Sequence, residues 1–393
     1  MIQNEAPKPS SSSSSSSSYS LPEIGITYNA LPHRHHHHHH HLVSTLQSMN
    51  LNSVSLPEPD PQTTRLFSYS SISLLLYVPN SSLREISSNR SNALRWLNLH
   101  LLPFHPRVHV SAISVGDDID PLSDLSPLLL PAMSNLLQAL HHVGIPNISV
   151  STTFSFARVM TPTPFPPSSA RFRPDSATEA LVKPILNFIA QTNSSFLVKL
   201  HPYHLYRSQP GIIPIGFALF QEDQAAPFNF RDDPFTGLRY RNLFDVMVDA
   251  VISGIESHQG HRGGGGGVVP VVVAETGWPS YVDGEGEAKD VYAEMYVKGL
   301  VRHLRSGLGT PMRRDGVAQV YIYELFDEEE DDDDGGSQRS KWGIMYDNMT
   351  QKYNVDFSSS SSTSAHHHHL IHLLLPNWFG LSVMMIILIC LNL

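Results

Sequence analysis

Residues 271–280 read Val-Val-Val-Ala-Glu-Thr-Gly-Trp-Pro-Ser. The three valines predict a buried strand, because β-branched side chains suit a strand that is covered on both faces. The strand is expected to stop near Gly277 and Pro279, since glycine permits a turn and proline cannot extend a ladder of hydrogen bonds. Glu275 then lies where the strand emerges, with the ring of Trp278 three residues on. A carboxylate at the mouth of an apolar strand is costly unless it has a partner or does chemistry, and beside an aromatic ring that chemistry is expected to act on a sugar.

Similar short apolar runs recur along the chain, with helical patterns between them. The expected strands are Ile24–Tyr28, Ser53–Leu56, Ser73–Val78, Val108–Val115, Ile148–Thr152, Ser195–Leu200, Val268–Ala274 and Ala318–Tyr323. The expected helices are Leu42–Met49, one amphipathic helix from Leu83 to Leu97, Pro131–His142, Ala177–Gln191 and Val291–Arg305. Alternation of strand and helix predicts a parallel sheet. Eight such repeats over about 330 residues fit an α/β fold, a single (β/α)8 TIM barrel, whose reactive residues stand at the C-terminal ends of the strands.

A second acidic position is expected at the end of the fourth strand, where Asp117 and Asp118 follow Gly116. Two adjacent aspartates are also common in solvated loops, so on sequence alone both interpretations stay open. Retaining glycosidases need two carboxyl groups about 5–5.5 Å apart, one as nucleophile and one as acid and base. Strands four and seven of a barrel could supply such a pair, with Glu275 as its other member.

The composition of the 393 residues excludes several other classes of function. The formal net charge is −10 and no basic stripe is present, which argues against a nucleic-acid partner. No cofactor or metal site is expected. The glycines at 263–267 lack the Lys-Ser/Thr that follows a phosphate-binding loop. The histidines at 35–41 fit an expanded loop after the first strand better than a metal site. The acidic block at 327–334 fits a solvated loop.

The two ends of the chain differ from the middle. Residues 1–21 form a serine-rich segment that predicts a disordered tail and has no apolar run of a signal peptide, so we expect the natural start to differ. Residues 22–357 are the expected barrel domain. Residues 358–393 combine small residues, a histidine spacer and an apolar tail that holds the one cysteine, Cys390, which is the order of a GPI-anchor signal. A tail-anchored membrane helix is the alternative, although Pro376 and Asn377 interrupt the apolar run.

The motif AETGWPS at 274–280 also resembles the nucleophile signature of plant endo-1,3-β-glucanases, glycoside hydrolase family 17. The resemblance extends from about Leu21 to Phe357. Further matching stretches are SLLLYVPN at 73–80, ISVG at 113–116, ISVSTTFS at 148–155, FPPSSARF at 165–172, GFALF at 216–220, YRNLFDVMVDA at 240–250, GTP at 309–311, YIYELFDE at 321–328 and WGIMY at 342–346. The resemblance implies a (β/α)8 barrel and retaining hydrolysis of internal β-1,3-glucosidic bonds.

The same resemblance implies roles for individual residues. Glu275 falls on the nucleophile, and Asp118 falls where the family pattern VGNE has its glutamate acid/base. Asp117 replaces the asparagine of that pattern. In the family pattern NxYPF, Lys199 and His201 replace the asparagine and the tyrosine, and Asp331 and Gln338 replace an expected lysine and glutamate. The expected substrate-binding residues are Tyr28, Asp117, Tyr203, Trp278 and Glu328.

These departures leave more than one function open. An aspartate carboxyl at position 118 reaches about 1.5 Å less far than that of glutamate, and a 1 Å misplacement can cost about a hundredfold in rate. The leading expectation is slow hydrolysis of callose-like β-1,3-glucan by a monomer at the extracellular face of the plasma membrane or cell wall, attached only through its C-terminal tail. The alternatives are a glucan-binding protein without hydrolysis and a glucan transglycosylase.

Overall fold

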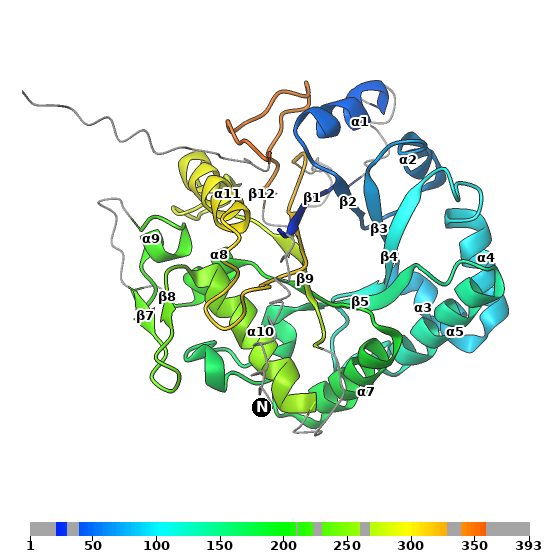
Figure 1. The fold of residues 1–393 in the computed structure, drawn as a ribbon, viewed down its shortest axis with the longest axis horizontal. Coiled ribbons are helices and arrows are strands. Elements are labelled where there is room, and N and C mark those ends of the chain that lie inside the picture. The colour runs from blue at the N-terminus through cyan, green and yellow to red at the C-terminus, as the bar shows by residue number, and fades with distance from the viewer. Residues whose placement is uncertain are drawn as a thin grey trace, which may run out of the picture. The chain divides into compact units, whose positions relative to one another are not determined.

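The computed structural model describes residues 21–29, 39–209, 211–222, 230–259, 268–327 and 339–358. Within these residues, eight parallel strands close into a barrel (Figure 1), which confirms the predicted TIM-barrel fold. In their order around the barrel, the strands are β1 (Glu23–Thr27), β11 (Gln319–Ile322), β9 (Val271–Thr276), β6 (Phe196–Lys199), β5 (Ser149–Ser155), β4 (His109–Asp117), β3 (Ser73–Val78) and β2 (Ser53–Leu56). The first strand pairs with both the second and the last, so the barrel has no free edge.

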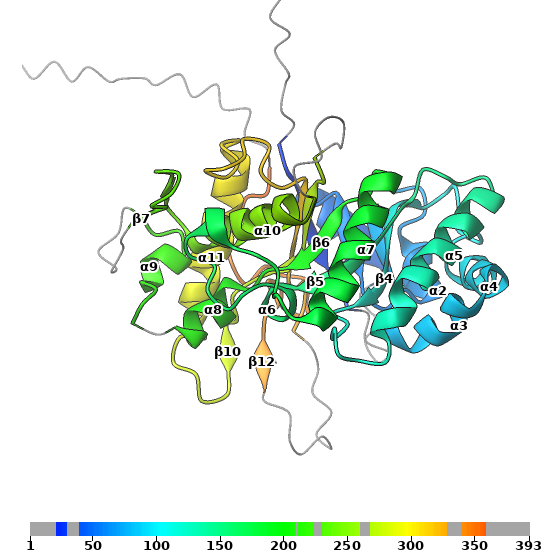
Figure 2. The same cartoon turned by 90° about the horizontal axis from the view of Figure 1, so that it is seen from below.

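Helices surround the strands (Figure 1). They are α1 (His39–Ser48), α2 (Pro61–Leu66), α3 (Leu83–Ser88), α4 (Arg90–His100), α5 (Leu129–His142), α6 (Phe156–Val159), α7 (Ser176–Thr192), α8 (Pro202–Ser208), α9 (Ile215–Ala218), α10 (Leu243–Gln259) and α11 (Asp290–Arg305). Two short antiparallel ribbons lie outside the barrel: β7 (Arg231–Asp232) with β8 (Arg239–Tyr240), and β10 (Tyr281–Val282) with β12 (Ser340–Lys341), the second pair lying side by side in Figure 2.

Side chains alternate between the inside of the barrel and the layer beneath the helices. On β3, Leu75 and Tyr77 belong to the interior cluster, whereas Leu74, Leu76 and Val78 belong to the larger core shared with the helices. This is the two-residue period of a strand that is covered on both faces. The interior cluster is completed by Leu197, Val272, Ala274 and Tyr321. The continuous apolar runs of the sequence therefore fill two separate cores at once.

Two bulges break this alternation at the C-terminal ends of β4 and β9. On β4, Ser114 pairs with Ser151 but Asp117 pairs with Thr153, so β4 has one extra residue. The extra residue lies next to Gly116, whose φ of 73° suits glycine. On β9, an extra residue beyond Val273 appears against both neighbouring strands. Because a single-residue shift exchanges the two faces of a strand, each bulge redirects the residues that follow it.

The start and the end of the barrel are held together by one arginine at the C-terminus of α11. Arg305 donates to the carbonyl of Phe357 through Nε at 3.2 Å and through a terminal nitrogen at 2.8 Å. Its other terminal nitrogen lies 3.5 Å from the carbonyl of Pro22. Pro22 directly precedes β1, so this junction lies at the N-terminal ends of the strands.

One predicted helix is two helices in the structure. The amphipathic pattern from Leu83 to Leu97 predicted a single helix, but α3 and α4 are separated at Asn89. The backbone of Asn89 is extended, and its side chain caps α4 by accepting a hydrogen bond from the amide of Asn92 at 3.0 Å. A short amide side chain competes with helical hydrogen bonds, so this asparagine starts a new helix instead of continuing the old one.

Several element boundaries also differ from the predicted ones. Strands β4, β5 and β9 continue past their apolar runs to Asp117, Ser155 and Thr276. The loop predicted for the histidines at 35–41 is wrong for the last three, which belong to α1. Helix α10 was not predicted. Helix α5 begins two residues before Pro131, which was expected to open it.

Other predictions fall on residues outside the described part of the chain. These are the disordered tail up to residue 20, most of the histidine run, the glycine run at 263–267, most of the acidic block and the apolar tail from residue 359. Among the described helices, none combines the length and apolar character that crossing a bilayer requires.

Gly277 offers a test of how tightly the end of β9 is packed. A Cβ at this position would meet the carbonyl oxygen of Tyr323 at 2.4 Å, a contact that only a backbone shift can relieve. We expect Gly277→Ala to lower the free energy of unfolding by about 1–3 kcal/mol, measured by denaturant titration. Gly286→Ala is the control, because a Cβ there meets nothing within 4 Å. Equal stability of the two variants would contradict the close approach at Gly277.

Candidate active site

Glu275 lies at the open end of the barrel, turned inward by the bulge in β9. Its neighbour Thr276 faces outward, where its hydroxyl is 2.6 Å from that of Tyr296 on α11. The Glu275 carboxylate is buried, with Oε1 2.9 Å from Nζ of Lys199 and Oε2 3.6 Å from Nε2 of His201. Burial by itself would raise the pKa of this carboxyl, but the His201 hydrogen bond and the Lys199 charge bring the pKa below its ordinary value. Glu275 is therefore ionised at neutral pH, the form that a nucleophile requires.

Asp117 faces the same ammonium from the opposite side. Its Oδ2 lies 2.7 Å from Nζ of Lys199. Asn80 fixes the backbone of Asp117 by two hydrogen bonds, accepting from its amide at 2.8 Å and donating to its carbonyl at 2.9 Å. Burial, followed by the charge of Glu275, raises the pKa of Asp117, although Lys199 acts against this shift. The structure thus brings two predicted site residues, Glu275 and Asp117, together through a lysine.

Lys199 ends β6 and is itself largely buried. Burial alone would lower the pKa of its ammonium group, but the charges of Glu275 and Asp117 raise this pKa above the ordinary value of 10.5. Because one ammonium contacts an oxygen of each carboxyl group, those two oxygens are at most about 5.6 Å apart. This limit is shorter than the roughly 6.5–9.5 Å separation of inverting glycosidases.

Asp118, the predicted acid/base, points elsewhere. It follows the bulge of β4 with a φ of 47°, in the left-handed region that aspartate tolerates. Its Oδ2 accepts from Nε of Arg158 at 2.9 Å, and its Oδ1 accepts from the amide of Ser155 at 3.2 Å. The hydrogen bond and charge of Asp118 raise the pKa of Arg158. Arg158 also contacts Asp120 at 2.9 Å, so Asp118 forms part of a surface ion-pair network.

A layer of hydroxyl groups lies beneath the carboxylates. The hydroxyl of Ser114 is 2.9 Å from that of Thr153, which donates to the Tyr77 hydroxyl at 3.2 Å. Burial and the charges of Asp117 and Glu275 raise the pKa of Tyr77 well above 10.0. The phenol therefore stays neutral and can only donate or accept hydrogen bonds below the charged layer.

The three aromatic residues expected to bind substrate have little exposed surface. Tyr28, Tyr203 and Trp278 are all buried. The indole of Trp278 donates to the carbonyl of Glu287 at 2.9 Å and packs against the ring of Tyr203 at 5.1 Å, and the Tyr203 hydroxyl donates to Glu285. Each ring packs among other side chains, and the role of these residues in substrate binding stays a prediction. Glu328 lies outside the described residues.

Sequence reasoning assigned no role to several residues that surround Glu275. Trp342, in the stretch after β12, lies with its ring 5.4 Å from that of His201 and thus lines the same region. Glu324 follows β11 and accepts a hydrogen bond from Asn29, which follows β1, at 2.9 Å. Asn29 and Glu324 share one sequence signal, because each comes shortly after a barrel strand, whereas Trp342 follows the ribbon strand β12. Among the described residues, no cluster of His, Cys, Asp and Glu side chains could hold a metal ion.

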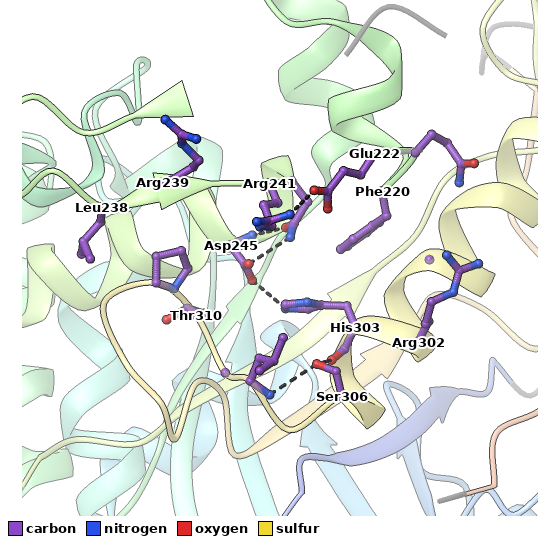
Figure 3. Close-up of a pocket in the computed structure, with 16 residues that line it drawn as sticks. Phe220, Glu222, Leu238, Arg239, Arg241, Asp245, Arg302, His303, Ser306 and Thr310 are labelled. Carbon is purple, nitrogen blue, oxygen red and sulfur yellow. Dashed lines mark hydrogen bonds and ion pairs between the residues drawn. The ribbon is translucent and has the colours of Figure 1, made fainter. Parts of the chain in front are cut away.

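A separate cavity of about 550 Å³ lies between α10 and α11 (Figure 3). It contains none of the predicted site residues. Its polar residues are largely paired: His303 with Asp245 at 2.8 Å and Arg241 with Glu222. This cavity is therefore separate from the charged residues at the barrel mouth.

Comparisons with known proteins identify the family of the chain. The family model described as glycosyl hydrolases family 17 matches residues 24–357. A protein of Arabidopsis thaliana named glucan endo-1,3-beta-glucosidase 13 is 33% identical over 302 residues, which are 76% of this chain and 56% of that protein. Glucan endo-1,3-beta-glucosidase B of Solanum lycopersicum is 33% identical over 292 residues, 73% of this chain and 74% of that protein. The chain spans about half the length of the first curated relatives that it matches.

Two solved structures of plant glucan hydrolases have a similar fold. A beta-1,3-glucanase and allergen of Cryptomeria japonica pollen superposes with a TM-score of 0.72 at 30% identity, covering 86% of this chain and 99% of that one. A structure from a study of two plant beta-glucan endohydrolases superposes with a TM-score of 0.72 at 28% identity, covering 85% and 100%.

Removal of the central cation tests the charge arrangement. In Lys199→Gln, Glu275 stays buried without its ammonium, which we expect to lower the free energy of unfolding at pH 7 by about 3–5 kcal/mol. Lys298→Gln is the matched control, since Lys298 pairs with Glu294 on an exposed helix surface.

The loss should depend on pH. The folded-state pKa of Glu275 is lowered, so its charged form stabilises the fold above pH 4.5, and this contribution disappears as the pH falls through the lowered value. Denaturant titrations of wild type and Lys199→Gln should therefore differ most near neutral pH and converge in acid. A constant difference across this range would contradict the ion pair.

Proposed function

The chain belongs to glycosyl hydrolases family 17, and on this premise we propose that it hydrolyses internal 1,3-β-D-glucosidic bonds of β-1,3-glucan with retention of configuration. The observation that supports the proposal is Glu275, a buried carboxylate at the barrel mouth that contacts the same ammonium as a second carboxyl group at the end of β4. Inverting enzymes need about 6.5–9.5 Å between their two carboxyl groups to admit a water, so carboxyl groups closer than this favour a covalent intermediate. The relatives are named glucan endo-1,3-beta-glucosidases, and as the natural substrate of this chain we propose a callose-like β-1,3-glucan.

In the proposed reaction, Glu275 attacks the anomeric carbon while the bond to the leaving oxygen breaks. An acid at the end of β4 protonates that oxygen, and the same group then takes a proton from the water that releases the sugar from Glu275. The sequence assigns this acid to Asp118. Lys199 keeps Glu275 ionised, but its contact must weaken before the carboxylate can reach the sugar, so we expect slow turnover.

That contact also favours a second candidate function. An ammonium at 2.9 Å from the nucleophile reduces its reactivity, so the chain could bind glucan without cleaving it. Turnover separates the two functions.

We expect the wild type to release reducing ends slowly from linear β-1,3-glucan, and Glu275→Gln to lose about a thousandfold or more of this rate while still binding glucan. Glu256→Gln is the control, because Glu256 is exposed and pairs only with Arg313. If the wild type cleaves neither the glucan nor an aryl β-glucoside with an activated leaving group, yet binds the glucan, the binding function replaces hydrolysis. Products longer than the substrate would identify transglycosylation.

For localisation, we propose attachment to the outer face of the plasma membrane through a GPI anchor. The support is the order of residues in 358–393, where small residues and a histidine spacer precede an apolar tail. We expect the chain, expressed in plant cells behind a working signal peptide, to be released from membranes by a phospholipase that cuts GPI anchors. Retention in the membrane, with Leu370–Leu393 still present by mass spectrometry, would replace the anchor with a membrane-spanning tail.

A further inference from the structure

Both aspartates at the end of β4 are candidates for the proton donor, and their surroundings differ. We propose that Asp117, and not Asp118, donates the proton to the leaving glycosidic oxygen, and that Asn80 and Lys199 position it. This inference rests on the proposed hydrolytic function and assigns one of its steps.

The position of Asp117 carries the proposal. The bulge beside Gly116 turns its side chain to the inside of the barrel, where it faces Glu275 across Lys199. The two hydrogen bonds from Asn80 fix its backbone at a strand end, where a catalytic group needs to be held. Its Oδ1 is buried and has no hydrogen-bond partner among the described residues, whereas Oδ2 faces Lys199. A proton on Oδ1 leaves the contact of Oδ2 with Lys199 intact.

The contacts of Asp118 argue against a role as proton donor. Both of its carboxylate oxygens are already engaged, one by the guanidinium of Arg158 and the other by the amide of Ser155. To reach a glycosidic oxygen between Asp117 and Glu275, Asp118 would have to leave both donors. Its observed role is to tie the end of β4 to the start of α6.

Charge balance supports Asp117 as well. Burial, with the nearby charge of Glu275, raises the pKa of Asp117, as a general acid requires, while the pKa of Glu275 is lowered. In the proposed glycosylation step, Asp117 enters protonated, beside the Lys199 ammonium and the Glu275 carboxylate. Glycosylation moves the Asp117 proton to the leaving oxygen and turns Glu275 into a neutral ester.

One ammonium therefore serves both halves of the reaction. The negative charge passes from Glu275 to Asp117, and Lys199 contacts both, at 2.9 Å and 2.7 Å. When water attacks the glycosyl ester, its proton returns to Asp117, its oxygen joins the anomeric carbon, and Glu275 leaves as a carboxylate. The formal charge of the trio is unchanged throughout, which avoids exposing an unpaired charge in a buried site.

Paired amide variants test the assignment. We expect Asp117→Asn to lower kcat/KM on linear β-1,3-glucan by about a hundredfold to ten-thousandfold, and Asp118→Asn by less than about tenfold. Asp232→Asn is the matched control, since this exposed aspartate pairs only with Arg239. Melting temperatures establish that each variant is folded.

A second measurement separates proton donation from a structural role. An aryl glucoside with a strongly acidic leaving group needs no protonation, so Asp117→Asn should still form its glycosyl-enzyme, and added azide should restore turnover by replacing the water that needs a base. The fall of kcat/KM at high pH, caused by ionisation of Asp117, should be absent from this variant.

The outcomes distinguish this inference from the proposed function. If Asp118→Asn loses activity and shows azide rescue, while Asp117→Asn keeps its activity, the donor is Asp118 and the inference is overturned but hydrolysis stands. If Asp117→Asn is folded but equally impaired on both substrates and is not rescued, Asp117 has a structural role only. If the wild type turns over neither substrate, the proposed function fails, and this step fails with it.

Discussion

One largely buried ammonium group that contacts two carboxyl groups is the constraint on which the site depends. Lys199 faces Asp117 and Glu275 at hydrogen-bond distance, and removal of this cation would leave the Glu275 carboxylate buried without its ammonium partner. The fold supplies this arrangement from three separate strands, β4, β6 and β9. Bulges on β4 and β9 turn the two carboxylates inward, whereas Lys199 follows the ordinary alternation of β6 and needs no bulge.

Polarity increases in steps along the inside of the barrel. An apolar cluster that includes Leu75 and Val272 fills the interior, the hydroxyls of Ser114, Thr153 and Tyr77 lie among the strands, and the charged trio stands at the strand ends. The hydroxyl groups lie between the charged groups and the apolar cluster. The charged groups can therefore form hydrogen bonds instead of contacting hydrocarbon directly. This order explains why polar residues continue β4 and β9 past the ends of their apolar runs.

The sequence sufficed for the barrel but not for the direction of its key side chains. Runs such as Ser73–Val78 predicted strands correctly, because a strand covered on both faces must be apolar throughout. Because such a strand is apolar on both faces, its sequence does not show which face each residue takes. The bulge that turns Glu275 inward could therefore not be predicted. The directions of the adjacent Asp117 and Asp118 side chains could not be predicted either. Their partners, Lys199 and Arg158, come from distant parts of the chain. Burial of Trp278 was equally a matter of tertiary packing.

The contacts of Arg305 have a consequence for how the barrel and its site are held. This arginine gathers the carbonyls of Pro22 and Phe357, the two ends of the barrel, at the face opposite to Glu275. The junction and the barrel mouth therefore lie at opposite ends of the strands. Closure of the barrel and the arrangement of its charged residues rest on different contacts, so a change in one need not disturb the other.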